Sequence, residues 1–506
     1  QGILPVKGLQ NRRIAVVTMG NENDLQSMFQ RRCANYAQCT PFNFNLGGDI
    51  KALADQVKAS GSNVLILSVA SSDYVAAARY LASHFADHLH KVIVAVMSDP
   101  QRLDEVGALL DDSYVSAAVL AYDNSTVSED YLAQTIFGGN AARGVLPVNV
   151  KSGKPDGGLK AGTGIKYDAC RLGYTIPAEV GFKPSLTALV DSVCRYGVQQ
   201  HAFSGCEVVV ARHGKIVFNR AYGEIDYDSG IPVTENTLFG LASVSKATGT
   251  LSGVMKCYDE GKFQLDDKVS TVIPGMRNTD EKDITFREML YHESGLPPEL
   301  SMWYMMFDPK TYTGPLFTST PNQYNTIKFM NNAYGNKFAK LRTDILSTVK
   351  TDKFNWPIAA GLWGGQVTYD SIMNRIYHQQ LHEKRYVYSD LNFALLGNAV
   401  QNMSGMPLNY FVENNFFAPL GAYHTLYRPL SRFAGSQIAY TEYDPFLRHQ
   451  HVHGYVHDEL AAFSGGVQGN AGLFSNANDL CKLLQMWLNG GTYGGQRFLK
   501  ASTVET

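Results

Sequence analysis

The sequence predicts two domains of different class, an α/β domain followed by an α+β domain. At 506 residues the chain is too long for one ordinary hydrophobic core. Its first part alternates short apolar runs with helix-like segments, whereas its later part opens with a hairpin pattern and continues as mostly helical sequence. A stretch rich in Gly, Lys and Pro separates the two parts. We therefore divide the chain into residues 1–150, a linker of residues 151–182, and residues 183–506.

Short apolar runs in the first domain predict a buried parallel sheet. They are rich in Val, Ile and Leu without polar alternation, as strands covered on both faces are. Between them lie helical patterns such as residues 49–61, where apolar residues are spaced by three and four before a terminal Gly. This alternation predicts a doubly wound, flavodoxin-like sheet with right-handed crossovers. The predicted strands are residues 12–20, 63–69, 91–97 and 116–122.

The second domain begins with a predicted hairpin and contains a long amphipathic helix. Residues 205–226 hold two β-rich runs on either side of His213 and Gly214, which is a turn signal. After Ser243, apolar residues recur at steps of three and four as far as Phe263, and Gly261 is suited to end a helix. Strands followed by helices predict an α+β domain.

Composition and charge exclude several classes of protein. The formal net charge is −2, so there is no overall basic field to hold nucleic acid. No apolar run approaches the roughly 18 residues that a membrane span needs. No GxGxxG follows the first predicted strand, so a dinucleotide cofactor is not indicated. The seven cysteines contain no CxxC pair, which argues against a zinc ribbon. Residues 1–17 show no signal-peptide pattern and suggest a fragment of a longer protein.

Ser243 and Lys246 form the first candidate pair of catalytic residues. Residues three apart on a helix are neighbours, so the lysine amine can reach the serine hydroxyl. A serine hydroxyl is a weak nucleophile until a nearby base takes its proton. The alternative is structural, since serine is also a favoured residue at a helix N-terminus. The pattern by itself leaves both roles open.

The block FGLASVSKATGTL, which contains Ser243, is followed by five further blocks in a fixed order. Together these blocks resemble the penicillin-recognising serine hydrolases, which include class C β-lactamases, D-alanyl-D-alanine peptidases and related esterases. The resemblance covers about residues 205–500 and implies a serine β-lactamase/transpeptidase-like fold. The five later blocks are DDKVSTVIPG (266–275), ITFREMLYHESGLPP (284–298), YVYSDLNFALLG (386–397), FFAPLGAYHTLY (416–427) and the segment 465–491.

The resemblance implies a role for each of four residues. Ser243 would be acylated, Lys246 would assist removal of its proton, and Tyr388 would be a second proton relay. Asp390 stands at a substrate-binding position where the family has asparagine. An ionised carboxylate cannot donate a hydrogen bond, so contact with a substrate amide is in doubt there. Asp390 can instead pair with Lys246 or lie in a solvated turn.

The family also has a third motif, a Lys/His-Thr/Ser-Gly strand that lines the site and supplies a second oxyanion N–H. In relatives of this shape the strand follows the 465–491 block by tens of residues, whereas this chain ends at Thr506. We therefore expect the second domain to lack its final strands. Losing one oxyanion donor typically costs about 10²–10³ in rate, so we expect this chain to be weakly active.

The segment QTIFGGNAARGVLPVNV (134–150) carries a different resemblance. It is similar to the C-terminal, sheet-containing domain of family-3 glycoside hydrolases of the β-N-acetylhexosaminidase type, over about residues 10–150. In that family the catalytic acids lie on a preceding barrel, for which this chain has no sequence. No glycosidase residue is therefore carried over to it.

Two further groups of residues have weaker chemical interpretations. His292 and Glu293 lie within a matched block, where they are expected to hold a loop. The segment RHQHVHGYVHDE contains four histidines that, on a strand, would place several imidazoles on one face and allow a zinc site. We expect a histidine-rich surface loop instead, because part of it resembles a segment of the serine hydrolases that binds no metal. These histidines are His449, His451, His453 and His457.

The expected function is acyl transfer to water through a Ser243 ester, with no metal and no cofactor. The substrate is expected to be a β-lactam, a D-alanyl peptide or an ester, and the glycosidase-like neighbour favours peptidoglycan fragments in the periplasm or cell envelope. The alternatives are a non-catalytic domain that binds cell-wall fragments and a zinc-dependent hydrolase. The sequence leaves the oligomeric state open.

Overall fold

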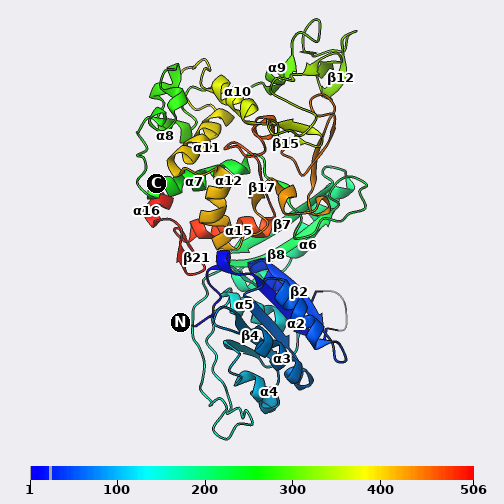
Figure 1. Ribbon diagram of the computed structural model, residues 1–506, viewed down its shortest axis with the longest axis vertical. Coiled ribbons are helices and arrows are strands. Elements are labelled where there is room, and N and C mark those ends of the chain that lie inside the picture. The colour runs from blue at the N-terminus through cyan, green and yellow to red at the C-terminus, as the bar shows by residue number, and fades with distance from the viewer. Residues whose placement is uncertain (1, 22–25) are drawn as a thin grey trace.

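The computed structural model describes residues 2–21 and 26–506. A parallel sheet flanked by helices forms one end of the molecule, and a larger mixed α and β part forms the other (Figure 1). This arrangement agrees with the predicted order of an α/β part before an α+β part.

The first domain contains a five-stranded sheet with the order β2-β1-β3-β4-β5, and every neighbouring pair is parallel. The four predicted strands are all present, and β2 is the strand that the sequence pattern missed. Its sequence CTPFNF is polar and half-exposed because it lies at an edge, where Pro41 is also tolerated. The strands are β1 (Ile14–Met19), β2 (Cys39–Phe44), β3 (Val64–Val69), β4 (Lys91–Met97) and β5 (Ala117–Ala121).

Alternate residues along the strands pack into two separate cores. Ala15 and Leu65 face a core built with helices α2, α3 and α4. Ile14 and Val64 face the other way, into a core that includes α1 and α5 and continues without a break into the second domain. The two domains therefore share one hydrophobic core. The helices are α1 (Met28–Tyr36), α2 (Ile50–Ala59), α3 (Val75–Phe85), α4 (Leu103–Leu110) and α5 (Thr126–Phe137).

The predicted linker lies against the first domain and then enters the second. Isolated bridges join Ala142 to Tyr167 and Val150 to Leu159, so the chain doubles back before it leaves. Strand β6 (Gly173–Tyr174) then adds to the sheet of the second domain, which has the order β6-β8-β7. The end of the segment predicted as a linker is thus part of a folded sheet, because β6 pairs with β8.

Polar contacts tie the two domains together beside the shared core. The Tyr36 hydroxyl donates to the Leu172 carbonyl at 2.8 Å, and the Tyr174 hydroxyl donates to Asn478 Oδ1 at 2.5 Å. The Arg32 guanidinium lies 3.4 Å from the centre of the Tyr174 ring. All of these aromatic rings are buried, so the domain junction is packed in the same way as a protein interior.

The predicted hairpin is strands β7 (Gly205–Arg212) and β8 (Lys215–Gly223). His213 and Gly214 both have positive φ angles, 52° and 73°, as a two-residue turn between twisted strands requires. Helix α6 (Leu186–Gln199) packs on β8. Helix α15 (Ala477–Leu488) packs on β7, whereas most other helices of the domain form a separate half (Figure 1). These other helices include α7 (Ser252–Asp259), α8 (Phe286–Leu290), α10 (Gln366–Ile376), α11 (Asp390–Ser404), α12 (Leu408–Val412), α14 (Glu459–Phe463) and α16 (Ala501–Glu505).

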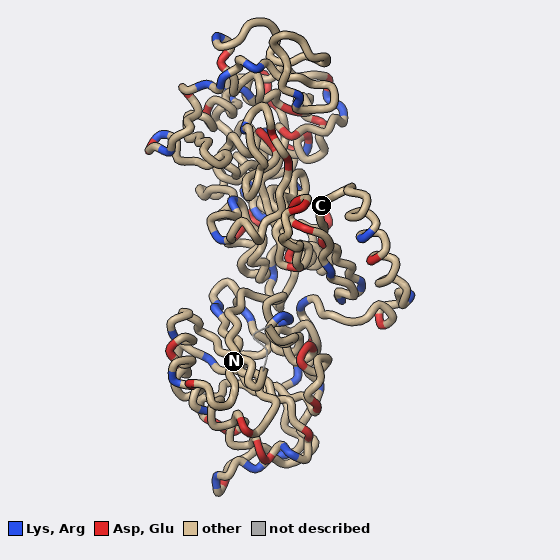
Figure 2. The backbone as a smooth tube through the Cα atoms, turned by 90° about the vertical axis from the view of Figure 1, so that its right-hand side faces the viewer, with Lys and Arg blue, Asp and Glu red and all other residues tan. Residues whose placement is uncertain are grey.

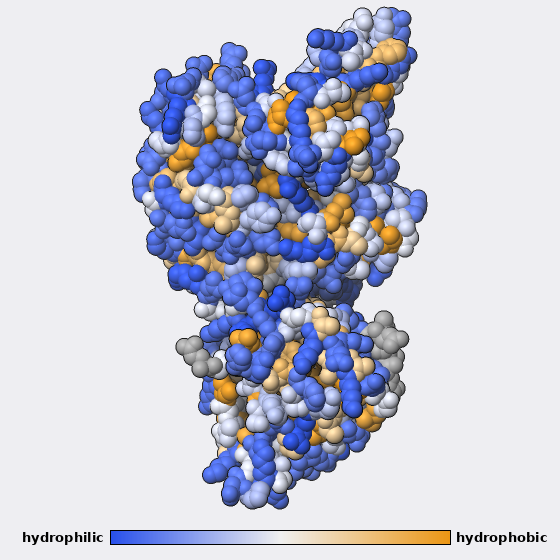
Figure 3. All heavy atoms as spheres, in the orientation of Figure 1, coloured by the Kyte–Doolittle hydropathy of each residue, from blue (hydrophilic) through white to orange (hydrophobic). Residues whose placement is uncertain are grey.

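Charged residues of both signs are interspersed along the whole chain (Figure 2). The face shown in Figure 3 is mostly hydrophilic with scattered apolar patches. Among the described residues, no helix is both long and apolar enough to span a membrane.

Candidate active site

Ser243 lies in a tight turn between a strand and a helix. Strand β9 (Phe239–Gly240) pairs with β20 (Leu473–Ser475), and the helix begins one residue after the serine, at Val244. Ala242, directly before it, has a φ of 44°, a left-handed conformation that costs free energy in a residue with a Cβ atom. The turn leaves Ser243 and Val244 exposed at the surface, while Ser245 and Lys246, which follow them, are buried. An exposed serine at a helix start is accessible to a substrate.

Lys246 points back along the helix toward Ser243. Its Nζ atom donates to Ser243 Oγ at 2.8 Å and to the Asn470 carbonyl at 3.0 Å. The lysine is only 5% exposed, so its ammonium group lies in a largely dry environment. The structure therefore places the two residues of the SxxK pattern in direct contact, and no hydrogen bond in the described residues uses the Ser243 hydroxyl as a helix cap.

Asp390 completes the surroundings of the lysine. Its Oδ1 atom lies 2.6 Å from Lys246 Nζ, which makes an ion pair. The same oxygen has no aligned hydrogen bond among the described residues, so the contact is electrostatic rather than directional. Of the two roles that the sequence left open for Asp390, pairing with Lys246 is the one found.

Helix α11 positions the residues of the block YVYSDLNFALLG (386–397). Ser389 is its N-cap, and the Ser389 hydroxyl accepts from the Leu391 N–H at 3.2 Å and donates to the Pro297 carbonyl at 2.6 Å. The centre of the Tyr388 ring lies 5.0 Å from Lys246 Nζ. Tyr388 is 45% exposed, and its hydroxyl makes no hydrogen bond within the described part of the chain. The ring therefore borders the lysine, while its hydroxyl is available to a ligand.

His292 contacts both Ser389 and Tyr388, in keeping with the predicted role of holding a loop. Its Nδ1 atom accepts from the Ser389 N–H at 3.0 Å, and its ring packs on the Tyr388 ring at a centroid distance of 4.6 Å. Burial, reinforced by the charge of Lys246, lowers the pKa of His292. A neutral imidazole that accepts at Nδ1 carries its proton on Nε2. His292 thus positions Tyr388 and has no contact with Ser243 among the described residues.

Asn470 and Asp458 form a network that the sequence analysis did not predict. The Asn470 carbonyl accepts from Lys246, while its side-chain amide donates to Asp458 Oδ1 at 2.9 Å. Asp458 also caps helix α14 by accepting from the Ala461 N–H. The neighbouring Gly469 packs so closely on α11 that a Cβ atom would lie 1.8 Å from the Phe393 carbonyl oxygen. Only glycine fits there, and this contact fixes the loop that holds Lys246.

A small acidic cavity adjoins the ion pair. It has a volume of about 70 Å³ and is bordered by the carboxylates of Glu299, Asp390, Asp458 and Glu459. Burial raises the pKa of Asp458, and it raises the pKa of Glu459 to about 7. The cavity therefore gathers several carboxylates, one of which, Asp390, forms the ion pair with Lys246.

The histidines of the segment RHQHVHGYVHDE each have a different partner. His451 lies near Asp226, His457 lies near Glu442, and His449 contacts the Pro445 carbonyl. His453 stacks on Tyr440 and contacts two carbonyl oxygens at 2.9 Å. Within residues 2–21 and 26–506 no group of three His, Cys, Asp or Glu residues is arranged to hold a metal ion. The segment is a short strand, β19 (Gln450–His453), with flanking turns.

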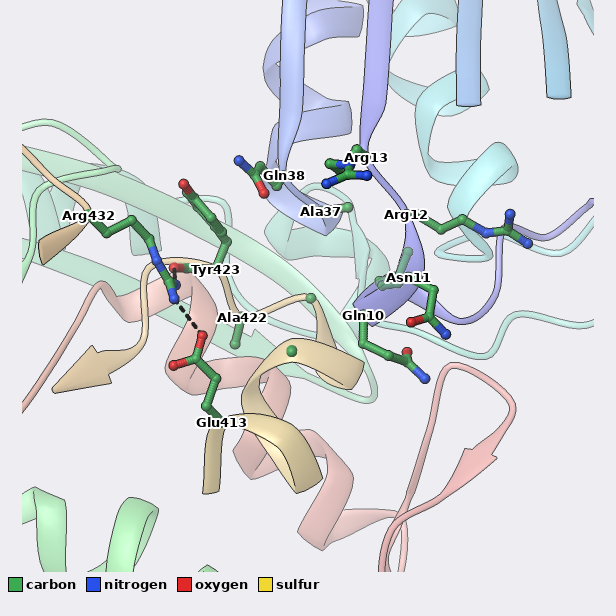
Figure 4. Close-up of a pocket in the computed structure, with 13 residues that line it drawn as sticks. Gln10, Asn11, Arg12, Arg13, Ala37, Gln38, Glu413, Ala422, Tyr423 and Arg432 are labelled. Carbon is green, nitrogen blue, oxygen red and sulfur yellow. Dashed lines mark hydrogen bonds and ion pairs between the residues drawn. The ribbon is translucent and has the colours of Figure 1, made fainter. Parts of the chain in front are cut away.

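A larger cavity of about 600 Å³ lies at the junction of the two domains (Figure 4). It is lined by residues 9–13 and 37–38 of the first domain and by both polar and small residues of the second. Arg432 pairs with Glu413 across one side of it, and Tyr423 borders the same side. None of the four predicted site residues lines this cavity, so it is separate from the serine site.

The exposed Ser243, the buried Lys246 and the adjacent Tyr388 thus form one cluster on an α+β domain. The chain belongs to the β-lactamase family, whose model, described as "Beta-lactamase", matches residues 190–506. This match covers more than half of the chain and includes all four predicted site residues.

Curated relatives match the same region. A protein of Escherichia coli (strain K12) named "Putative D-alanyl-D-alanine carboxypeptidase" is 29% identical over 328 residues, which cover 60% of this chain and 64% of that protein. A protein of the same name from Salmonella schwarzengrund is 28% identical over 353 residues, covering 65% of this chain and 70% of the relative. The chain thus spans about two thirds of the length of these relatives.

Among solved structures, an octameric penicillin-binding protein homologue from Pyrococcus abyssi is 16% identical with a TM-score of 0.43, covering 63% of this chain and 59% of its own. A β-lactamase/D-alanine carboxypeptidase from Yersinia pestis complexed with citrate is 20% identical with a TM-score of 0.39, covering 60% and 68%.

Proposed function

We propose that this chain is a serine hydrolase that transfers an acyl group from its substrate to Ser243 and then to water. The observation that carries the proposal is the contact of 2.8 Å between Lys246 Nζ and the hydroxyl of an exposed serine. Membership of the β-lactamase family supports the same chemistry.

The site suggests how the protons move. As Ser243 Oγ attacks a carbonyl carbon, its proton passes to Lys246 or to Tyr388, whichever of the two has already lost its own proton, and the same group then gives that proton to the leaving group as the bond to it breaks. Water then attacks the ester, and the proton returns to Ser243 Oγ. Asp390 and the Asn470 carbonyl hold the lysine amine within reach of the hydroxyl throughout. The helix N-terminus beside Ser243 favours the negative charge that develops on the attacked oxygen.

The substrate class that we propose is a D-alanyl peptide, with β-lactams and small esters as alternative acyl donors. The names of the Escherichia coli and Salmonella relatives support the peptide. We further propose that the protein acts on peptidoglycan fragments in the cell envelope, because a D-alanyl terminus is typical of that material.

The first domain carries a separate proposal. We infer that residues 1–150 derive from the C-terminal domain of a family-3 glycoside hydrolase, with a flavodoxin-like sheet. The parallel order β2-β1-β3-β4-β5 supports a doubly wound arrangement. Because that family places its catalytic acids on a barrel rather than on this domain, residues 1–150 by themselves should not hydrolyse an aryl N-acetylglucosaminide. Hydrolysis of that compound would refute the inference.

The test of the main proposal is covalent labelling by a fluorescent penicillin. We expect one label per chain, located at Ser243 by peptide mass spectrometry, in the presence or absence of a metal chelator. Ser243→Ala should abolish labelling, and Ser245→Ala, two residues away, should retain it. If the wild-type chain binds peptidoglycan fragments without being labelled or cleaving a D-alanyl peptide, it is a binding domain instead. If the chelator abolishes activity, a metal is required and the proposal is wrong.

A further inference from the structure

A third cavity, of about 390 Å³, lies beside helix α14, on the side away from the acidic cavity. Leu460 of α14 borders the acidic cavity, whereas Ala462 of the same helix borders this one. Its lining includes residues of strand β15 (Trp356–Ala359) and the residues that directly follow strand β17 (Leu426–Tyr427). Both strands are labelled in Figure 1. The two cavities are therefore separated by one short helix.

The walls of this cavity are apolar. They include Ile358, Trp363, Leu430, Val456 and Phe474. A concave site of this size with mostly apolar walls and a few polar groups is typical of a small-molecule pocket.

Arg428 is the one charged residue in the lining of this cavity. Its Nε atom donates to the Gly465 carbonyl at 2.6 Å, which fixes the guanidinium plane. No carboxylate forms an ion pair with it in the described part of the chain. Burial lowers the pKa of Arg428, which reflects the cost of keeping this charge partly out of water.

The close packing around Arg428 also indicates that the position of the guanidinium is set by the fold. The backbone of Arg428 has a φ of 53°, a strained value for a residue with a Cβ atom. A Cβ atom on Gly465 would lie 3.0 Å from Arg428 Nη2 and 2.8 Å from the Trp356 ring. Glycine at this position therefore leaves the space that the guanidinium occupies.

We propose that this cavity binds a small organic carboxylate with an apolar body, the carboxylate pairing with Arg428 and the body packing against the apolar walls. An arginine presents its N–H groups as a planar fork that matches the two oxygens of a carboxylate. The ligand supplies the counter-ion that the chain does not, and the apolar walls exclude water around the pair. This site is distinct from Ser243 and needs no acyl transfer.

The test uses 3-phenylpropionate and its neutral analogue 3-phenylpropionamide as probes. Binding is measured by calorimetry and by saturation-transfer NMR on the Ser243→Ala protein, so that the serine cannot react. We expect saturable binding of the acid, at least about tenfold tighter than that of the amide, because only the acid can form a charge-assisted pair. Equal binding of the two probes, or no saturable binding of the acid, would overturn the proposal.

Variants locate the site. Arg428→Gln should weaken binding of the acid at least about tenfold, and Arg375→Gln, which removes an exposed cation elsewhere, should leave it unchanged. Because Arg428→Gln could perturb folding, Leu430→Asp provides a second route. Leu430 is 43% exposed at the rim, so the substitution is tolerated and its negative charge should repel the acid. Leu430→Asn is its neutral control. Unchanged affinity in both Arg428→Gln and Leu430→Asp would place the acid elsewhere and refute the site.

Discussion

Replacing Lys246 with methionine tests whether its contacts serve chemistry or only stability. The substitution keeps the length of the side chain but removes the cation that faces Asp390 at 2.6 Å. At an effective dielectric constant of about 20, two unit charges at this separation attract by about 6 kcal/mol, part of which is offset by desolvation. Asp390 is 23% exposed, so we expect Lys246→Met to lower the free energy of unfolding by about 3 kcal/mol.

The double variant Lys246→Met/Asp390→Asn separates the two roles. It removes the unpaired carboxylate that also faces Asp458, and it should regain about 2 kcal/mol of the lost stability. Hydrolysis of a nitrophenyl ester should stay at least about 10³-fold below wild type in both proteins. Stability is measured by urea unfolding at pH 7. If Asp390→Asn destabilises the Lys246→Met protein further, or restores its activity, the assigned roles are wrong.

Three further substitutions test other parts of the structure. Tyr388→Phe should lower kcat/KM by about 10²–10⁴-fold, with little change in stability because the ring is half-exposed. The control Tyr386→Phe should change neither the rate nor the stability. If Tyr388→Phe lowers stability without lowering the rate, the role of Tyr388 is structural. Burial raises the pKa of Glu207 to about 8 from an ordinary 4.5, so the unfolded chain releases this proton first and stability falls as pH rises between these values. Glu207→Gln should therefore be more stable than wild type at pH 9 and similar to it at pH 4, as measured by urea unfolding. If the difference in unfolding free energy between variant and wild type is the same at both pH values, the reasoning is wrong. Tyr174→Phe removes a buried hydrogen bond to Asn478 and should cost about 1–2 kcal/mol; an unchanged melting temperature would mean that this contact does not stabilise the domain junction.

Local patterns in the sequence were enough to predict much of the fold. Three of the five strands in the parallel sheet, β1, β3 and β4, are continuous apolar runs because both of their faces are buried, and the half-buried edge strand β5 is also apolar. The sequence analysis did not predict β2, because this edge strand has exposed polar residues and so lacks a continuous apolar run. The turn at His213 and Gly214 was predictable because a two-residue hairpin needs positive φ angles at both positions. The shared core of the two domains was not predictable, since an apolar face does not reveal what it packs against.

The same division holds for the active site. Ser243 and Lys246 are three residues apart, so helix geometry alone brings them together. The Asn470 carbonyl, which is 224 positions away, could not be found in this way, because every residue has the same backbone carbonyl and no side chain marks the one that is used. Asp390 was a candidate with two possible roles, and only tertiary packing decided that it pairs with Lys246. The sequence by itself thus determined that Ser243 and Lys246 lie side by side, whereas the surroundings that hold the lysine depend on contacts between segments far apart in the chain.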